Sequence, residues 1–200
     1  MLTKTINGVY SNSNITAVRS CAFHRQYGLT EVHLPNVTRL DGSAFYSCVA
    51  LEEINAPNAS LPSTATFSGC TALTSVSLLS TITSIPNYTF ANNSSLTNID
   101  FPLIRTVGIS AFVNCTGLTS VSFPSTTARV DEWSFAGSNN LTTFIAPRLG
   151  SIGNKGFNGC SKLVNLEVPY KVHMGDTVFN NCKALTIFVH NSTALYTSNF

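Results

Sequence analysis

Hydrophobic residues recur along the chain in one fixed pattern, which residues 108–124 show most fully. In this stretch Phe112 is followed six residues later by Leu118, after which Val121 and Phe123 alternate with serines. Counterparts of Phe112 recur at steps of 22 or 23 residues, and together they are Phe23, Phe45, Phe67, Phe90, Phe112, Phe135, Phe157 and Phe179. A leucine lies six residues after each of these repeat phenylalanines, at Leu29, Leu51, Leu73, Leu96, Leu118, Leu141, Leu163 and Leu185. A fixed period of this length predicts a solenoid, in which each coil completes the core of its neighbours.

One repeat predicts a short strand and a return path. Val121 and Phe123 alternate with Ser120 and Ser122, which is the two-residue period of a strand with one buried face. Pro124 follows, and proline is tolerated at the end of a strand because no ladder hydrogen bond is needed there. A second apolar pair is expected to cross the opposite side of the coil, and the Ala-Phe pair to begin a short helical turn. The predicted fold is therefore an α/β solenoid of about eight coils of 22–23 residues, with a parallel β-sheet on one face.

The repeats divide the chain into three parts. Residues 15–191 hold the recognisable repeats and are expected to form the solenoid. Residues 1–14 contain Gly8 and a Ser-Asn-Ser-Asn run, which indicates an irregular lead-in or a degenerate first coil. Residues 192–200 are expected to form a C-terminal tail.

The repeated unit is similar to that of a known family. It combines Ala-Phe, a cysteine three residues after the phenylalanine, a leucine three residues further on, and Val-x-Leu-Pro, over about residues 15–191. This unit resembles the BspA-like, or Treponema pallidum-type, leucine-rich repeats. The departures from it are local: Gln26, Asn93 and Ser138 stand at the cysteine position, and Leu79 and Asn191 stand at the proline position. The resemblance implies a right-handed solenoid with a parallel sheet on one face.

The same resemblance implies a function. Members of the family are typically surface or secreted proteins of bacteria and some protist parasites, and they are associated with adhesion to host proteins or other cells. We therefore expect a non-enzymatic adhesion or protein-binding module at the cell surface or outside the cell, with a protein or cell-surface ligand. Similar arrays occur in proteins encoded by bacterial viruses, so a structural repeat domain of a phage tail or fibre, within a virion, is the alternative.

Composition changes this picture mainly by exclusion. Charged residues are 10% of the 200-residue chain, against roughly 25% in an average soluble protein, and the formal net charge is +2. The Lys and Arg residues are scattered along the chain, so no nucleic-acid partner is expected. The start of the chain lacks the basic residues and apolar run of a signal peptide, and no window approaches the roughly 20 apolar residues of a membrane-spanning helix. We expect no signal peptide in this chain and no membrane insertion.

The six cysteines admit three interpretations. Cys21 lies two residues before its phenylalanine, whereas the other five share one repeat position, at Cys48, Cys70, Cys115, Cys160 and Cys182. A shared position favours a ladder of buried thiols, each meeting a nearby backbone group. Disulfides between adjacent coils are the second interpretation, although parallel side chains in one column rarely have the required torsion. Zinc binding is the third, but the sequence lacks the paired Cys-x-x-Cys ligands that zinc needs.

Catalytic residues are not expected to converge. The histidines occupy four different repeat positions, at His24, His33, His173 and His190. Glu52 and Glu53 are expected near Glu31, where a solvated acidic patch is favoured over a pair that acts as acid and base. Glycine-rich phosphate loops and nucleotide signatures are absent from the sequence. A fragment of a carbohydrate-active enzyme would need a convergent carboxylate site, which the pattern does not supply, so no enzyme activity, cofactor or metal is expected.

The outward positions of the predicted strands form the candidate binding face. They lie eight and ten residues after each repeat phenylalanine: Glu31 and His33, Glu53 and Asn55, Ser75 and Ser77, Asn98 and Asp100, Ser120 and Ser122, Thr143 and Ile145, and Asn165 and Glu167. Variable side chains on a rigid sheet suit binding, because few rotamers need ordering on contact. The competing interpretation is that small Ser and Thr are simply neutral surface residues.

Two further features bear on partners. Ile187 and Val189 continue the outward series after Ile145, so the face grades from acidic to neutral to apolar. Such apolar positions predict that a further coil, a cap or another chain covers the C-terminal end, and they allow self-association through the end coils. Trp133 lies two residues before its phenylalanine, and we interpret it as a partly packed aromatic rather than a contact anchor.

Overall fold

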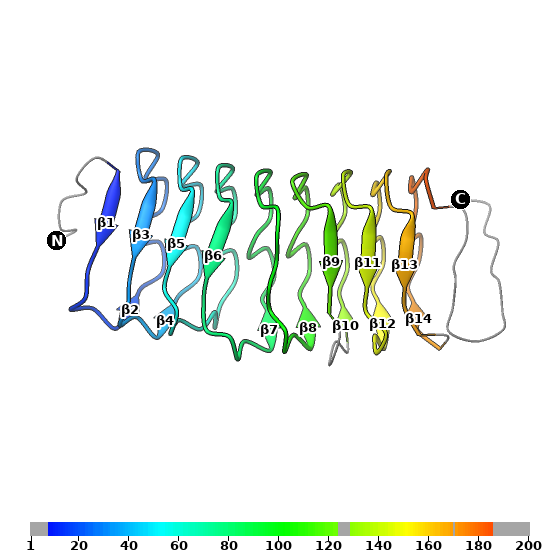
Figure 1. Ribbon diagram of the computed structural model, residues 1–200, viewed down its shortest axis with the longest axis horizontal. Helices are drawn as coiled ribbons and strands as arrows, with labels where there is room; N and C mark the ends of the chain where they lie inside the picture. The colour runs from blue at the N-terminus through cyan, green and yellow to red at the C-terminus, as the bar shows by residue number, and fades with distance from the viewer. Residues whose placement is uncertain (1–7, 124–128, 170, 186–200) are drawn as a thin grey trace.

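The computed structural model describes residues 8–123, 129–169 and 171–185. These residues wind into a solenoid of parallel strands with about seven turns, drawn from end to end in Figure 1. Eight repeat phenylalanines enclose seven turns, because each turn runs from one of them to the next. The predicted parallel solenoid is confirmed.

One side of the solenoid carries three-residue strands, and we call it the main face. Strands β1 (Val9–Ser11), β3 (Glu31–His33), β5 (Glu53–Asn55) and β6 (Ser75–Ser77) pair in parallel in that order. Strands β9 (Ser120–Ser122), β11 (Thr143–Ile145) and β13 (Asn165–Glu167) form a second parallel group. Figure 1 shows the two groups following one another along the same side. The middle residue of each strand points into the core, as Val32, Ile54 and Val121 do, because side chains alternate along a strand.

The opposite side carries two-residue strands, and we call it the second face. Strand β2 (Ala17–Val18) pairs with β4 (Arg39–Leu40). Strands β7 (Ser84–Ile85), β8 (Thr106–Val107), β10 (Arg129–Val130), β12 (Ser151–Ile152) and β14 (His173–Met174) pair in parallel one after another. These strands lie along the lower edge of Figure 1. Buried residues such as Val107 and Ile152 complete the core from this side, as the second apolar pair of each repeat predicted.

The repeat phenylalanines form a continuous stack between the two faces. From Phe23 to Phe179, neighbouring ring centroids lie 5.0–5.6 Å apart with interplanar angles of 7–18°. A buried phenylalanine contributes about 1.5–3 kcal/mol, and a stacked pair adds about 0.5–1.5 kcal/mol. Tyr10 of β1 packs edge-on against Phe23 at 4.8 Å. Part of the lead-in over residues 1–14 therefore joins the sheet and the core.

The Ala-Phe segments are turns, and the short helical turns expected from the sequence are not formed among the described residues. The residues two before and two after each repeat phenylalanine have positive φ, as Ser43 (54°) and Ser47 (55°) do around Phe45. A residue with positive φ cannot continue a right-handed helix. Instead, each turn bonds to the next coil, and the N–H of Phe45 donates to the carbonyl oxygen of Thr66 at 2.9 Å. The turns therefore stack as a ladder of their own.

The five cysteines at the shared repeat position form a ladder of buried thiols. Their Sγ atoms donate to the carbonyl oxygen of the preceding repeat phenylalanine at 2.9–3.1 Å, in Cys48, Cys70, Cys115, Cys160 and Cys182. Ser138 stands at the same position, and its hydroxyl makes the same bond to Phe112 at 3.0 Å. All six cysteines are free thiols. The buried ladder is the interpretation that the structure confirms.

Thiol reactivity should separate Cys21 from the other five cysteines. Cys21 is exposed, whereas the others are buried. Burial raises the pKa of Cys115 to about 12 and that of Cys182 to about 11. At pH 8 the reactive thiolate of Cys115 is then only about one part in 10,000. The side-chain hydrogen bond with Cys70 lowers the pKa of Cys48, but that thiol is fully buried and out of reach of a reagent. We expect a chromogenic aryl disulfide to modify one thiol per native chain at pH 8, and all six cysteines in denaturant.

Replacement of Cys21 by serine is the control for this assignment. Cys21→Ser should abolish the native reaction and leave five reactive thiols in denaturant. Rapid native modification of several thiols would contradict the buried ladder.

Candidate binding face

The N-terminal half of the main face presents the predicted residues as two rows. Strands β3, β5 and β6 pair in register, so outward side chains on neighbouring coils stand directly beside one another. The rows are Glu31, Glu53 and Ser75, and His33, Asn55 and Ser77. The residues of β5 and β6 in these rows are exposed, and those of β3 are partly exposed. Because parallel strands keep a spacing of about 4.8 Å, each row is a regularly spaced array of side chains.

The C-terminal half repeats this arrangement on β9, β11 and β13. The rows are Ser120, Thr143 and Asn165, and Ser122, Ile145 and Glu167. Asn165 Nδ2 donates to Thr143 Oγ1 at 3.2 Å, which links one row through its side chains. Ile145 is partly buried between polar neighbours. The continuation of the apolar series at Ile187 and Val189 lies outside the described residues.

The predicted strand through Asn98 and Asp100 is not formed. Both residues are exposed and Ile99 between them is buried, so the alternation persists. However, no backbone N–H of residues 97–100 donates to a neighbouring coil within the described part of the chain. The interruption coincides with a change at one core position of the repeat, where Phe101 and Phe123 follow one another on successive coils. Along the chain this position holds Leu34, Ala56, Leu78, Phe101, Phe123, Ala146 and Val168. The main face is therefore divided between β6 and β9.

The charges of the main face have one sign. Of the fourteen candidate residues, the carboxylates are Glu31, Glu53, Asp100 and Glu167, and none of the fourteen is Lys or Arg. Glu52 adds an exposed carboxylate beside Glu53. His33 Nε2 lies 3.4 Å from Glu31 Oε2, a partly exposed contact of small energy. The N-terminal half of the main face is therefore acidic.

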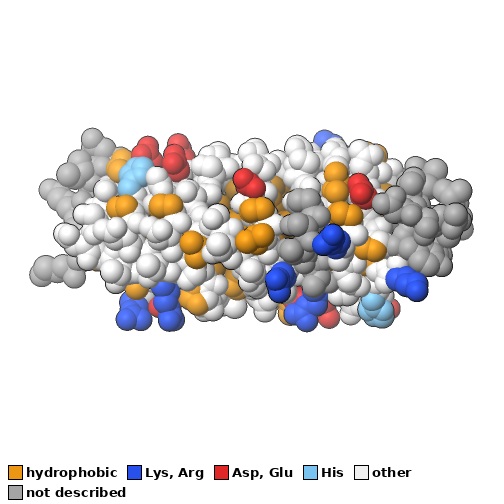
Figure 2. All heavy atoms as spheres, turned by 60° about the horizontal axis from the view of Figure 1, so that its bottom comes forward, with side chains coloured by type: hydrophobic (Ala, Val, Ile, Leu, Met, Phe, Trp, Pro, Cys, Tyr) orange, Lys and Arg blue, Asp and Glu red, His pale blue; other side chains and the backbone are white. Residues whose placement is uncertain are grey.

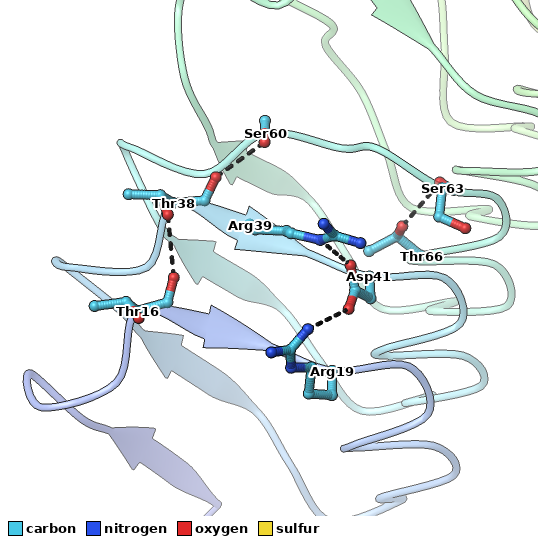
Figure 3. A network of polar contacts seen from close by, with 8 residues as sticks. All are labelled: Thr16, Arg19, Thr38, Arg39, Asp41, Ser60, Ser63 and Thr66. Carbon is cyan, nitrogen blue, oxygen red and sulfur yellow. Dashed lines mark hydrogen bonds and ion pairs between the residues drawn. The ribbon is translucent and has the colours of Figure 1, made fainter.

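The second face carries paired charges that the sequence pattern did not predict. Arg39 Nε bonds to Asp41 Oδ1, and Arg19 Nη1 lies 3.9 Å from Asp41 Oδ2, as Figure 3 shows. The same Arg-x-Asp spacing recurs at Arg129 and Asp131, whose Nε and Oδ1 atoms lie 2.7 Å apart. In both pairs the arginine lies six residues, and the aspartate four residues, before a repeat phenylalanine. An alignment of the repeats could therefore have revealed the shared spacing. Figure 2 shows Lys and Arg side chains gathered along the lower part of the molecule, whereas red carboxylates lie at its upper edge near the N-terminal end.

In the described ranges, no three His, Cys, Asp or Glu side chains come together as metal ligands. The His24 ring packs at a tilt of 52° against Tyr46 with ring centroids 5.1 Å apart, and His173 lies on β14 of the second face. His190 falls outside the described residues. The outward side chains of the main face present hydrogen-bonding groups and carboxylates.

Two further features concern membranes and the tryptophan. Over the residues that the structure describes, no helix has the length and apolar character needed to span a bilayer. Trp133 is 37% exposed, and Lys155 Nζ lies 4.6 Å from its ring centroid. This cation–π contact covers part of the indole, in agreement with the interpretation of a partly packed aromatic.

Comparisons with known proteins agree with this architecture. The model of the BspA type leucine rich repeat region matches the chain in six copies, over residues 3–104 and 83–200. A leucine rich repeat protein of T. pallidum is similar, with 25% sequence identity and a TM-score of 0.70 over 78% of this chain and 77% of that chain. A leucine-rich repeat protein from Bacteroides ovatus ATCC 8483 shares the fold, with 20% identity and a TM-score of 0.52 over 89% of this chain and 62% of that chain. No curated protein sequence matches the chain.

Proposed function

The chain belongs to the BspA-type leucine-rich repeat family, and on that premise we propose that it is a non-enzymatic adhesion module that binds a protein ligand through its main face. It acts at the cell surface or outside the cell, where members of the family are typically found. Leucine-rich repeats generally mediate protein interactions. The main face carries three-residue strands whose outward side chains stand in register with those of neighbouring coils.

The observation that carries this proposal is the rigidity of the rows on the main face. Each side chain of these rows sits on a strand that pairs in parallel with a neighbouring coil and whose middle residue faces the core, as Ile54 does. Binding orders little of such a surface, because its backbone is already fixed and short residues such as Ser75 and Ser77 have few rotamers to lose. The rows therefore suit an extended contact with another protein.

Charge gives the partner a chemical character. The carboxylates of Glu31, Glu52 and Glu53 gather on the first coils of the main face, without a Lys or Arg among the outward positions. Complementary charge raises the rate of encounter and disfavours partners of like charge. We therefore infer that the ligand presents Lys or Arg side chains to the N-terminal half of the face.

A pair of arginine substitutions tests the main face. The ligand is first isolated with the full chain from solubilised surface proteins of cells to which the protein adheres, and its affinity is then measured with purified variants. Ser77→Arg places a bulky cation on an exposed row and is expected to weaken binding at least about tenfold, or about 1.4 kcal/mol. Ser80→Arg, three residues later in an exposed turn, is the matched control and should bind as the wild type does. Equal affinities for all three proteins would place the ligand elsewhere.

The alternative, a structural repeat domain of a phage tail, fibre or other assembly, has a different signature in solution. A free-standing module should show a molar mass near 21.4 kDa at every concentration in light scattering. A defined oligomer would instead support self-association through the end coils and the structural role.

A further inference from the structure

The second face holds an open depression, separate from the main face. It has a volume of about 440 Å³ and lies across β10, β12 and β14. Its polar lining comprises Arg129, Asp131, Glu132, Ser151, Asn154 and His173. This volume is within the range of roughly 300–1,000 Å³ that small-molecule sites occupy.

Two glycines line the depression, where adjacent coils approach each other closely. Asp131, Gly153 and Gly175 stand at the same repeat position on three successive coils, four residues before the repeat phenylalanine. A Cβ atom at Gly153 would lie 2.6 Å from the Glu132 nitrogen, and one at Gly175 would lie 2.4 Å from Asn154 Oδ1. The coils approach too closely here for a side chain. On the two coils that follow, the repeat position of Asp131 is therefore occupied by glycine and carries no side chain.

The Arg-x-Asp pair at this site differs from its counterpart near the N-terminus. Asp41 receives Arg39 from its own coil and Arg19 from the preceding coil, and its side chain is only 8% exposed. Figure 3 shows both guanidinium groups converging on that carboxylate. Asp131 pairs with Arg129, and its side chain is 20% exposed. The carboxylate of Asp41 is thus enclosed by two arginines, whereas that of Asp131 has one arginine partner and lines the depression.

The open pair offers donors and acceptors in a fixed arrangement. Arg129 Nε lies 2.7 Å from Asp131 Oδ1, and Nη2 donates to Oδ2 at 3.1 Å, so two bonds fix the two planar groups together. A guanidinium has five N–H donors, and each carboxylate oxygen accepts more than one hydrogen bond. Capacity for further bonds therefore remains on both groups. Hydroxyls on neighbouring carbon atoms each donate and accept, so a vicinal diol can bond to both groups at once.

Charge and shape select the class of ligand. Beside the imidazole of His173, the lining carries one guanidinium against the two carboxylates of Asp131 and Glu132, which disfavours phosphate, sulfate and other anions. Ser151 and Asn154 add neutral polar groups, and the partly exposed Ile109 provides apolar contact for C–H groups. We propose that the depression is a binding site for a neutral saccharide, with Arg129 and Asp131 holding adjacent hydroxyls. This site is independent of the protein-binding role proposed for the main face.

Trp133 provides the readout. It is the one tryptophan of the chain, it follows Glu132, and its backbone N–H donates to the carbonyl oxygen of Asn154 at 3.0 Å. The full chain is titrated with galactose, mannose, lactose, maltose and chitobiose, and with galacturonate as the anionic probe, following fluorescence and calorimetric heat. We expect saturable binding of at least one neutral saccharide. If galactose binds, galacturonate should bind at least about tenfold more weakly than galactose does. If galactose does not bind, galacturonate should not bind either.

Three variants complete the test. Asp131→Asn should weaken saccharide binding at least about tenfold, and Ser151→Tyr should abolish it by filling the depression while leaving the Arg129–Asp131 pair in place. Glu53→Gln on the main face should bind saccharide as the wild type does. Circular dichroism checks that each variant is folded. The proposal is overturned if no neutral saccharide binds, if galacturonate binds as tightly as the neutral sugars, or if folded Asp131→Asn and Ser151→Tyr both bind like the wild type.

Discussion

Replacement of Phe112 by alanine should lower the free energy of unfolding by about 3–5 kcal/mol. Phe112 has no exposed surface, and its ring is stacked between Phe90 at 5.4 Å and Phe135 at 5.2 Å. Truncation removes both ring contacts and leaves a cavity that the ladder-bonded turns cannot close. Because whole domains are stable by only about 5–15 kcal/mol, the loss is a large fraction of the total.

Urea unfolding followed by circular dichroism measures this effect. In a linear array each coil is stabilised mainly by its neighbours, so weakening a central coil should also split the transition into two steps. Tyr88→Ala is the matched control, because Tyr88 belongs to an adjacent coil and is 47% exposed. It should cost less than about 1 kcal/mol. A loss below that value for Phe112→Ala would mean that the phenylalanine stack does not hold the coils together.

Replacement of Asn93 by cysteine should raise the free energy of unfolding by about 1–3 kcal/mol. Asn93 is fully buried, and its Oδ1 accepts the N–H of Cys70 at 2.9 Å. Its Nδ2 is buried and has no hydrogen-bond partner among the described residues. A cysteine at this position removes the unpaired donor and can place its thiol against the carbonyl oxygen of Phe67, as Cys115 does against Phe90 at 3.0 Å.

The midpoint of urea unfolding is again the measurement. Asn93→Ser should also stabilise the protein, because Ser138 already makes the equivalent bond at this position in another coil. Asn98→Ser, at an exposed position in the same coil, should change the stability by less than about 0.5 kcal/mol. A lower midpoint for both Asn93 variants would show that the amide is better accommodated than its contacts indicate.

The repeat pattern predicted the strands well because side-chain alternation decides which residues face the core. Glu53–Asn55, for example, forms β5 with Ile54 buried, at the spacing from Phe45 that the sequence indicated. The helical turns were wrong because they depend on φ at positions such as Ser43, where serine gives no sign of a left-handed backbone. The missing strand at Asn98 and Asp100 was unpredictable for another reason. Alternation persists there, but pairing depends on the distance between coils, which the pattern does not contain.

The candidate sites were predictable to different degrees. The rows of the main face follow from counting residues after each phenylalanine, although their role in binding stays a prediction. The depression on the second face required knowledge of how closely adjacent coils approach. Gly153 and Gly175 look like ordinary loop glycines until the position of Asp131 in the preceding coil is known. Its open carboxylate is distinguished from that of Asp41 only by neighbours on other coils.

The interrupted main face gives the solenoid a mechanical joint. Residues 97–100 lack ladder bonds to either side among the described residues, whereas β7 and β8 remain paired on the second face. The second face and the turns still link this coil to its neighbours, as the N–H of Phe90 does by donating to the carbonyl oxygen of Ala111 at 2.8 Å. We therefore expect that any bending that widens the main face is resisted least at this coil. A ligand that contacts both strand groups of the main face would fix the angle between them. A ligand that contacts one group would leave that angle unconstrained.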